Sequence, residues 1–434
     1  MRALVQRPAV LDAFTYPRFR RVWVAGLVSQ LGDWMQIIGR AFLAFQLTGK
    51  AESVGIVYFA TYAPQLIFSL YGGVLADRFD RRRMLILTQV AQAVGSVVLG
   101  FLAASGNASV ANIAVLSFFL GIGFMLSIPA MQALQPTVVP RSGLSSAISL
   151  GTAANSVTRV FGPLLAALLI SSAGVEWVFW VNAVSFLAVI AVWATTPIPR
   201  QEPMEEERNL DAMRAALRFV RQTPAVSVPI VATGFLMAVG IVYQPLAVVY
   251  ATDVLADGVR SVGRDYFGWL QAGVGAGAAV GILALAGVGR RRPAATFVAT
   301  AIAFSVALAL LGRVSTFAPA LAIIVAVGGF HFANMALALT LVQHEVADAM
   351  RGRVMAIHMT ALIGFIPFTA LVGGLIVDRV GIRTTFTGAG LVCLGFSLLL
   401  LRFGRYIRLR EEPADEREIV ETAVAVGTLI EEEA

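Results

Sequence analysis

Charged residues are scarce in this chain of 434 residues: they make up 14% of it, whereas 58% of the residues are hydrophobic. The mean hydropathy of +0.79 lies far above that of soluble domains. A single cysteine, Cys393, excludes an internal disulfide and supports neither a metal site nor redox chemistry. The sequence also lacks a phosphate-binding loop, a metal-ligand cluster and a nucleophile–base set. We therefore expect an integral membrane protein that is not an enzyme and holds no metal or cofactor.

Lysine is almost absent, since Lys50 alone among the 33 basic residues is not arginine. A net charge of +7 can indicate nucleic-acid binding, but here the arginines lie mostly in loops between apolar runs. The charge pattern therefore indicates membrane topology, and no nucleic-acid partner is expected.

Apolar runs of about 20 residues or more, long enough to cross a bilayer as a helix, recur along the chain. The first run follows a basic segment, but it is too long for the apolar core of a signal peptide and is expected to be retained. The twelve expected spans are 21–48, 53–76, 84–105, 110–135, 143–173, 175–195, 225–252, 265–287, 294–312, 316–343, 354–377 and 384–403.

Basic residues are distributed unequally between the two sides of these spans. If the N-terminus is cytoplasmic, the cytoplasmic segments hold 25 of them, the outer loops six and the spans two. This bias follows the positive-inside rule and predicts that both termini are cytoplasmic.

An internal repeat divides the chain into two halves. Residues 121–179 align with 328–386 at a constant offset of 207, with Gly121 on Gly328. The sequence therefore predicts an all-α membrane protein of twelve helices in two pseudo-symmetric six-helix bundles, with its site between the halves near the midplane. The expected parts are 1–196 and 225–403 for the bundles, 197–224 for a cytoplasmic linker with an amphipathic helix, and 404–434 for an acidic cytoplasmic tail.

The stretch "GGVLADRFDRRR", residues 72–83, lies in the cytoplasmic loop between the second and third spans. Basic residues alone would orient the second span, but they do not explain the glycines or Asp77. The stretch resembles the loop 2–3 signature of the major facilitator superfamily, although Asp80 stands where that family prefers glycine. The matching residues are Gly73, Leu75, Ala76, Asp77, Arg78, Arg81 and Arg82. The resemblance implies a conformational latch, in which Asp77 contacts the start of the eleventh span near Arg353 when the cytoplasmic faces of the two halves meet.

Three further stretches resemble the bacterial macrolide-efflux-like and enterobactin-exporter-like branch of this superfamily. They are "FRRVWVAGLVSQLGDWMQ" in the first span, "NSVTRVFGPLLAALL" in the fifth and "RGRVMAI" at the start of the eleventh. Gly162 and Pro163 are similar to the Gly-Pro kink of exporters in the fifth span. The resemblance implies an exporter of drug-like or siderophore-like molecules that works by alternating access in the bacterial inner membrane. The arginine of the family's fourth-span pattern is missing, and Ser117 stands in its place.

Charged side chains inside the spans are costly and are candidates for function. Asp33 shares a face of the first span with Gln36 and Arg40, because offsets of three and seven residues return to one side of a helix. Asn155 and Arg159 form a similar stripe in the fifth span. The corresponding positions of the second half carry no charge.

Burial favours the protonated form of a carboxylate, whereas a neighbouring arginine favours the ionised form. Asp33 is therefore expected to couple proton movement to substrate binding together with Arg159 or Arg40. The alternative is a permanent ion pair that only fixes the packing.

Polar residues in the second half are expected to line the same cavity: His331 and Asn334 in the tenth span, and Tyr243 and Gln244 in the seventh. The sequence thus predicts a monomeric secondary transporter that exports amphipathic or hydrophobic small molecules, with protons and membrane lipids as its other partners. Translocation of a lysolipid or lipid-linked molecule by the same fold is the alternative. A receptor or scaffold explains neither the latch motif nor the asymmetry of the buried charges.

Overall fold

A computed structural model describes residues 9–78, 80–196, 210–288, 293–403, and within these ranges the chain forms helices and no strand. Ten segments of the described chain are long and apolar enough to cross a membrane. The 32-residue helix α1 is not one of these ten, and it carries both Asp33 and Arg40.

The helices of the first half match the expected spans to within a few residues. A short 3-10 helix, η1 (Ala9–Thr15), precedes them. They are α1 (Pro17–Thr48), α2 (Ala51–Arg78), α3 (Arg81–Ala104), α4 (Val110–Leu134), α5 (Leu144–Ser172) and α6 (Val175–Thr195). Two 3-10 helices, η2 (Gln135–Val138) and η3 (Arg141–Gly143), lie between α4 and α5, and the other connections are short.

Two spans of the second half are interrupted, whereas continuous helices were expected. The seventh consists of α8 (Pro224–Val239), η4 (Gly240–Val242), α9 (Tyr243–Val249) and the π-helix η5 (Tyr250–Leu255). The eleventh consists of α13 (Asp348–Ile363) and α14 (Ile366–Val380). Proline explains where the helices restart, because it lacks the N–H group that a helix interior needs but fits a first turn. Pro245 and Pro367 lie in the first turns of α9 and α14.

The other helices of the second half are α10 (Arg260–Val288), α11 (Pro293–Leu311), α12 (Phe317–Glu345) and α15 (Ile382–Phe403). The glycines of α10 allow its backbone to touch that of α12, as at Gly277 against the carbonyl of Val325. Glycines spaced along one face of a helix form a surface on which a second helix can pack closely.

The expected amphipathic helix is present as α7 (Leu210–Gln222). Ala216 and Val220 are buried with residues of α8 and α13, whereas Met213 and Leu217 remain exposed. The rest of the linker and the acidic tail lie outside the described residues.

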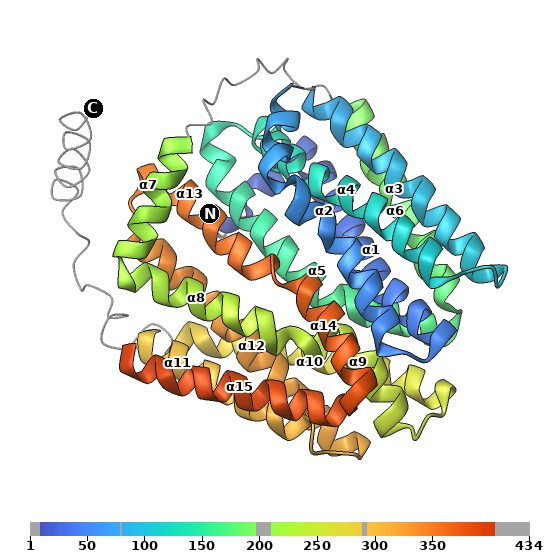
Figure 1. Ribbon diagram of the computed structural model, residues 1–434. Helices are drawn as coiled ribbons and strands as arrows, with labels where there is room; N and C mark the ends of the chain where they lie inside the picture. The colour runs from blue at the N-terminus through green and yellow to red at the C-terminus, as the bar shows by residue number, and fades with distance from the viewer. Residues whose placement is uncertain (1–8, 79, 197–209, 289–292, 404–434) are drawn as a thin grey trace, which may run out of the picture.

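Figure 1 shows the helices of the first half (blue to green) on one side of the molecule and those of the second half (yellow-green to red) on the other. The halves meet where α14 packs along α2 and α10 along α5. We call the end of the bundle at which α1 begins proximal and the end at which α1 finishes distal. On the distal side the ring of Phe42 stacks on Phe267 of the other half, with 6.1 Å between ring centroids.

Candidate functional site

A cavity of about 540 Å³ lies between the halves. Residues of α1, α2, α3, α4 and the proximal half of α5 line one wall, and residues of α8, η4, α9, α12, α13 and α14 line the other. Because the halves are in contact distally, the cavity extends toward the proximal end. Its polar lining includes Gln30, Asp33, Tyr58, Tyr62, Gln65, Asn155, Arg159, Gln244 and His331.

The two walls of the cavity differ in charge. Asp33 and Arg159 lie in the wall from the first half. The repeat pairs Asn155 with Leu362 and Arg159 with Ile366, and both apolar residues line the opposite wall. One wall is therefore charged and polar, and the facing wall is largely apolar.

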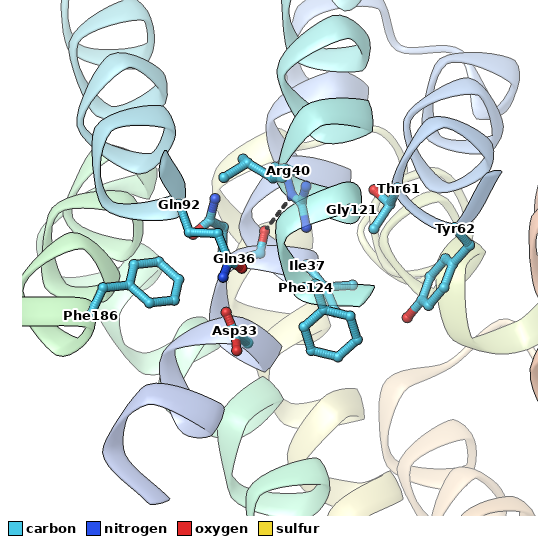
Figure 2. A pocket seen from close by; sticks show the side chains of 11 residues that line it. Asp33, Gln36, Ile37, Arg40, Thr61, Tyr62, Gln92, Gly121, Phe124 and Phe186 are labelled. Carbon is cyan, nitrogen blue, oxygen red and sulfur yellow. Dashed lines mark hydrogen bonds between the residues drawn. The ribbon is translucent and has the colours of Figure 1, made fainter. Parts of the chain in front are cut away.

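Asp33 also lines a second, much smaller pocket of about 20 Å³, enough for about one water molecule. Figure 2 shows Gln36 between Asp33 and Arg40, with Gln92, Thr61 and Tyr62 around the same space. Asp33 thus lies at the boundary between the large cavity and the small pocket.

Arg40 is buried at 5% exposure, and its Nε donates to the carbonyl oxygen of Gln36 at 3.3 Å. Its Nη1 atom is buried and has no hydrogen-bond partner. Among the residues that the structure describes, no carboxylate oxygen lies within 4.0 Å of Arg40 or Arg159. The permanent ion pair between Asp33 and an arginine, which was the alternative interpretation, is therefore not formed in this conformation.

A buried hydrogen-bond network fixes the side chain of Gln36. Its Oε1 atom accepts from Ser96 Oγ at 2.7 Å and from the amide of Asn182. Asn182 Oδ1 in turn accepts from Ser185 Oγ at 2.9 Å. Three helices, α1, α3 and α6, are joined at the level of the small pocket.

Arg159 lies over the ring of Trp34, with its Cζ atom 5.4 Å from the ring centroid. This is a cation–π contact between α5 and α1. Gly162 makes the contact possible, because a Cβ at this position would collide with the Cβ of Trp34. Pro163 lies next to it, and α5 continues as a helix through both residues to Ser172.

In the second half, Tyr243 OH and His331 Nδ1 are 3.0 Å apart. His331 and Gln244 line the cavity, and Tyr243 is fully buried behind them. Asn334 is not among the lining residues: its amide donates to the carbonyl oxygen of Phe297 at 2.8 Å and to Thr300 Oγ1 at 3.1 Å. Asn334 therefore joins α12 to α11. The prediction that it lines the cavity was wrong.

The side chains of Asp77, Arg78 and Arg81 and the surroundings of Gly73, all of which belong to the expected latch, lie outside what the structure describes. Arg82 Nη2 donates to the carbonyl oxygen of Ala194 at 2.6 Å, a contact within the first half. Arg353 is exposed on α13. Asp80 has a role that the sequence analysis missed, since its carboxylate accepts from Arg83 N at 2.8 Å and caps α3.

Several other lining residues were also missed. Tyr58, Tyr62 and Gln65 follow a spacing of four and three residues, a helical polar stripe that the sequence displays. Asn182 and Ser96 do not line the cavity; they lie in the apolar helices α6 and α3, and only the structure brings them to Gln36. No group of three or more residues that could hold a metal ion occurs in the described part of the chain.

Together, the paired helical halves and the cavity between them define a transporter of the major facilitator fold. The sequence agrees: the family model described as a transmembrane secretion effector matches residues 9–425. The chain belongs to this family of the major facilitator superfamily.

Relatives of similar length carry the name enterobactin exporter EntS. The protein of Citrobacter koseri is 24% identical over 405 residues, which covers 92% of this chain and 95% of the relative. The protein of Shigella boydii is 24% identical over 402 residues with the same coverage.

Solved structures share the fold at low identity. A variant of the nucleoside transporter NupG has a TM-score of 0.69 at 15% identity and covers 90% of this chain and 100% of its own. A bacterial homolog of the human lysosomal transporter Spinster, solved inward-facing and unoccupied, has a TM-score of 0.69 at 16% identity and covers 91% and 99%.

Proposed function

We propose that the protein is a secondary active exporter of amphipathic small molecules and that protons moving through Asp33 drive it. The observation that carries this proposal is the position of Asp33. Among the described residues it is the only carboxylate that lines the cavity, and it also lines the small pocket. A group at this boundary can exchange a proton between the two spaces while substrate occupies the larger one.

The contrast between the walls supports an amphipathic substrate. Ligand sites combine apolar walls with a few placed polar groups that fix orientation. Here Arg159, held over Trp34, offers a cation to the polar end of a ligand. Leu362 and Ile366 offer an apolar surface to the remainder.

The direction of transport rests on topology and on the relatives. The positive-inside rule places the proximal end in the cytoplasm, so the cavity would face the cell interior, where an exported molecule must bind. The relatives named as enterobactin exporters support export and suggest a siderophore-like substrate.

Antiport requires that proton and substrate exclude each other in the cavity. Ionised Asp33 accepts a hydrogen bond from a donor group of the substrate, such as a hydroxyl, while Arg159 holds the anionic part of the same molecule. Protonation of Asp33 removes the charge that strengthens this hydrogen bond and weakens binding. A proton that enters from outside would therefore favour release of the substrate, and its loss to the cytoplasm would restore the site for the next loading step.

The test uses purified protein in liposomes that contain a pH dye, with a catechol siderophore, an amphipathic dye and a labelled lysolipid as substrates. We expect substrate-dependent proton flux that Asp33→Asn abolishes. Asp265→Asn is the matched control, because Asp265 is 53% exposed on α10 and pairs with its neighbour Arg264 at 3.3 Å. If no substrate moves protons and the lysolipid crosses equally fast with and without Asp33, the antiport proposal fails and lipid translocation replaces it.

A further inference from the structure

The carboxylate of Asp378, near the distal end of α14, binds the start of α2 in the other half of the protein. Oδ1 accepts from Ala51 N at 2.9 Å and Oδ2 accepts from Glu52 N at 2.8 Å. The first N–H groups of a helix have no partner within it, and their partial positive charge attracts an anion. Asp378 therefore caps the N-terminus of α2 with both of its carboxylate oxygen atoms.

The backbones of α2 and α14 touch along the same contact. A Cβ at Gly374, one turn before Asp378, would lie 2.6 Å from the carbonyl oxygen of Ala51. A Cβ at Gly55, one turn further into α2, would lie 2.6 Å from the carbonyl oxygen of Ala370. Small residues on both helices thus bring Asp378 within hydrogen-bonding distance of α2.

A second contact joins the halves at the other side of the α1–α2 turn. Arg260, the first residue of α10, donates from Nη1 to the carbonyl oxygen of Gln46 at 3.1 Å. Gln46 lies in the last turn of α1, where unpaired carbonyl groups attract a cation. The second half therefore presents an anion to the start of α2 and a cation to the end of α1.

We propose that Asp378 and Arg260 form a distal latch, which holds the halves together on the side away from the cavity. Opening of the cavity to the distal side requires α14 to separate from α2 and α10 to separate from the end of α1, so both contacts must break in that step. The latch stabilises the observed conformation relative to one that is open distally. This inference concerns the conformational equilibrium alone and holds for any substrate or coupling ion.

The experiment measures the distance between the distal ends of the halves in full-length protein in lipid nanodiscs, without substrate. Cys393→Ala removes the single native cysteine, and spin labels are placed at Ala104→Cys, the last residue of α3, and at Ser315→Cys before α12, both exposed. Pulsed electron–electron resonance then gives the populations of short and long distances.

We expect Asp378→Ala to raise the ratio of long to short distances by about fivefold, the size of effect of one charge at a helix end. Arg260→Gln raises it independently, and the double variant raises it further. Asp265→Asn, which removes an exposed distal carboxylate without a contact between the halves, leaves the distribution unchanged.

An unchanged distribution in the double variant overturns the latch. If Asp378→Ala does not yield folded protein, Arg260→Gln decides the question alone, since it removes a separate contact. Because the readout needs no transport, a negative result here leaves the proposed function standing, and loss of proton coupling leaves the latch standing.

Discussion

Asp33 and Arg40 line the same small pocket on one face of α1, yet no ion pair within 4.0 Å joins them. Gln36, one turn from each, lies between them (Figure 2). A buried cation without a neutralising partner is costly, because the protein interior solvates it poorly. Arg40 therefore weakens the fold in this conformation, which is expected of a residue retained for function.

Replacement of Arg40 by methionine tests this interpretation. Methionine keeps a long side chain and removes the charge, so we expect the free energy of unfolding to rise by about 1 kcal/mol. Substrate-dependent proton flux should be lost in the same variant. The measurements are thermal unfolding followed by tryptophan fluorescence and the liposome assay. Arg313→Met, at an exposed distal position, should change neither quantity. Lower stability together with normal flux would show that Arg40 is structural.

The contact between Trp34 and Arg159 leads to a prediction about substrate binding. Trp34→Leu removes the ring that holds the guanidinium group, and we expect about fivefold weaker binding of an anionic amphipathic substrate. Arg159→Lys should also weaken binding, although it keeps the positive charge, because an ammonium group lacks the planar surface that stacks on a ring. Equilibrium binding of a labelled catechol siderophore and of a neutral dye measures the effect. Trp269→Leu, at a tryptophan that is 60% exposed, should leave binding unchanged. Equal losses for the two ligands would rule out a charge-selective role for Arg159.

Helical periodicity predicted the polar faces of α1 and α5, because offsets of three, four and seven residues are geometric properties of any helix. Asp33 and Arg159 do face one cavity. The same periodicity failed for His331 and Asn334, three residues apart. Their directions differ by about 60° at 3.6 residues per turn, which is enough to place one in the cavity and the other against α11.

Contacts between the halves could not be predicted. Asp378 and Ala51 are separated by 327 positions, and their pairing depends on how far α14 slides along α2. The sequence contains the glycines that allow close approach, but not the partner of each one. The interruptions of the seventh and eleventh spans could have been predicted more readily than these contacts, because Pro245 and Pro367 mark the two positions in the sequence.

The close contact of Gly162 with Trp34 predicts an effect on both stability and function. In Gly162→Ala the new methyl group must push α5 away from α1, at a cost of about 1–3 kcal/mol. The shift also moves Arg159, so the affinity for an anionic substrate should fall. Gly395→Ala on α15 is the control, because no atom lies within 4 Å of the added Cβ. Alanine there should be neutral or stabilising, since it favours a helix. If both variants unfold at the wild-type temperature, α5 tolerates the displacement and the contact is not tight.

The network around Gln36 can be tested as a unit. Gln36→Leu removes the oxygen that accepts from Ser96 and Asn182, and leaves two buried donors without an acceptor. We expect the free energy of unfolding to fall by about 2 kcal/mol, because a buried donor without an acceptor has lost its hydrogen bonds to water and gained none in the protein. Adding Ser96→Ala removes one of the stranded donors, so the double variant should be more stable than Gln36→Leu alone. Thermal unfolding of the wild type, both single variants and the double variant completes the cycle. Additive losses would show that Ser96 and Gln36 contribute separately, and the proposed link between α1 and α3 beside Asp33 would then be wrong.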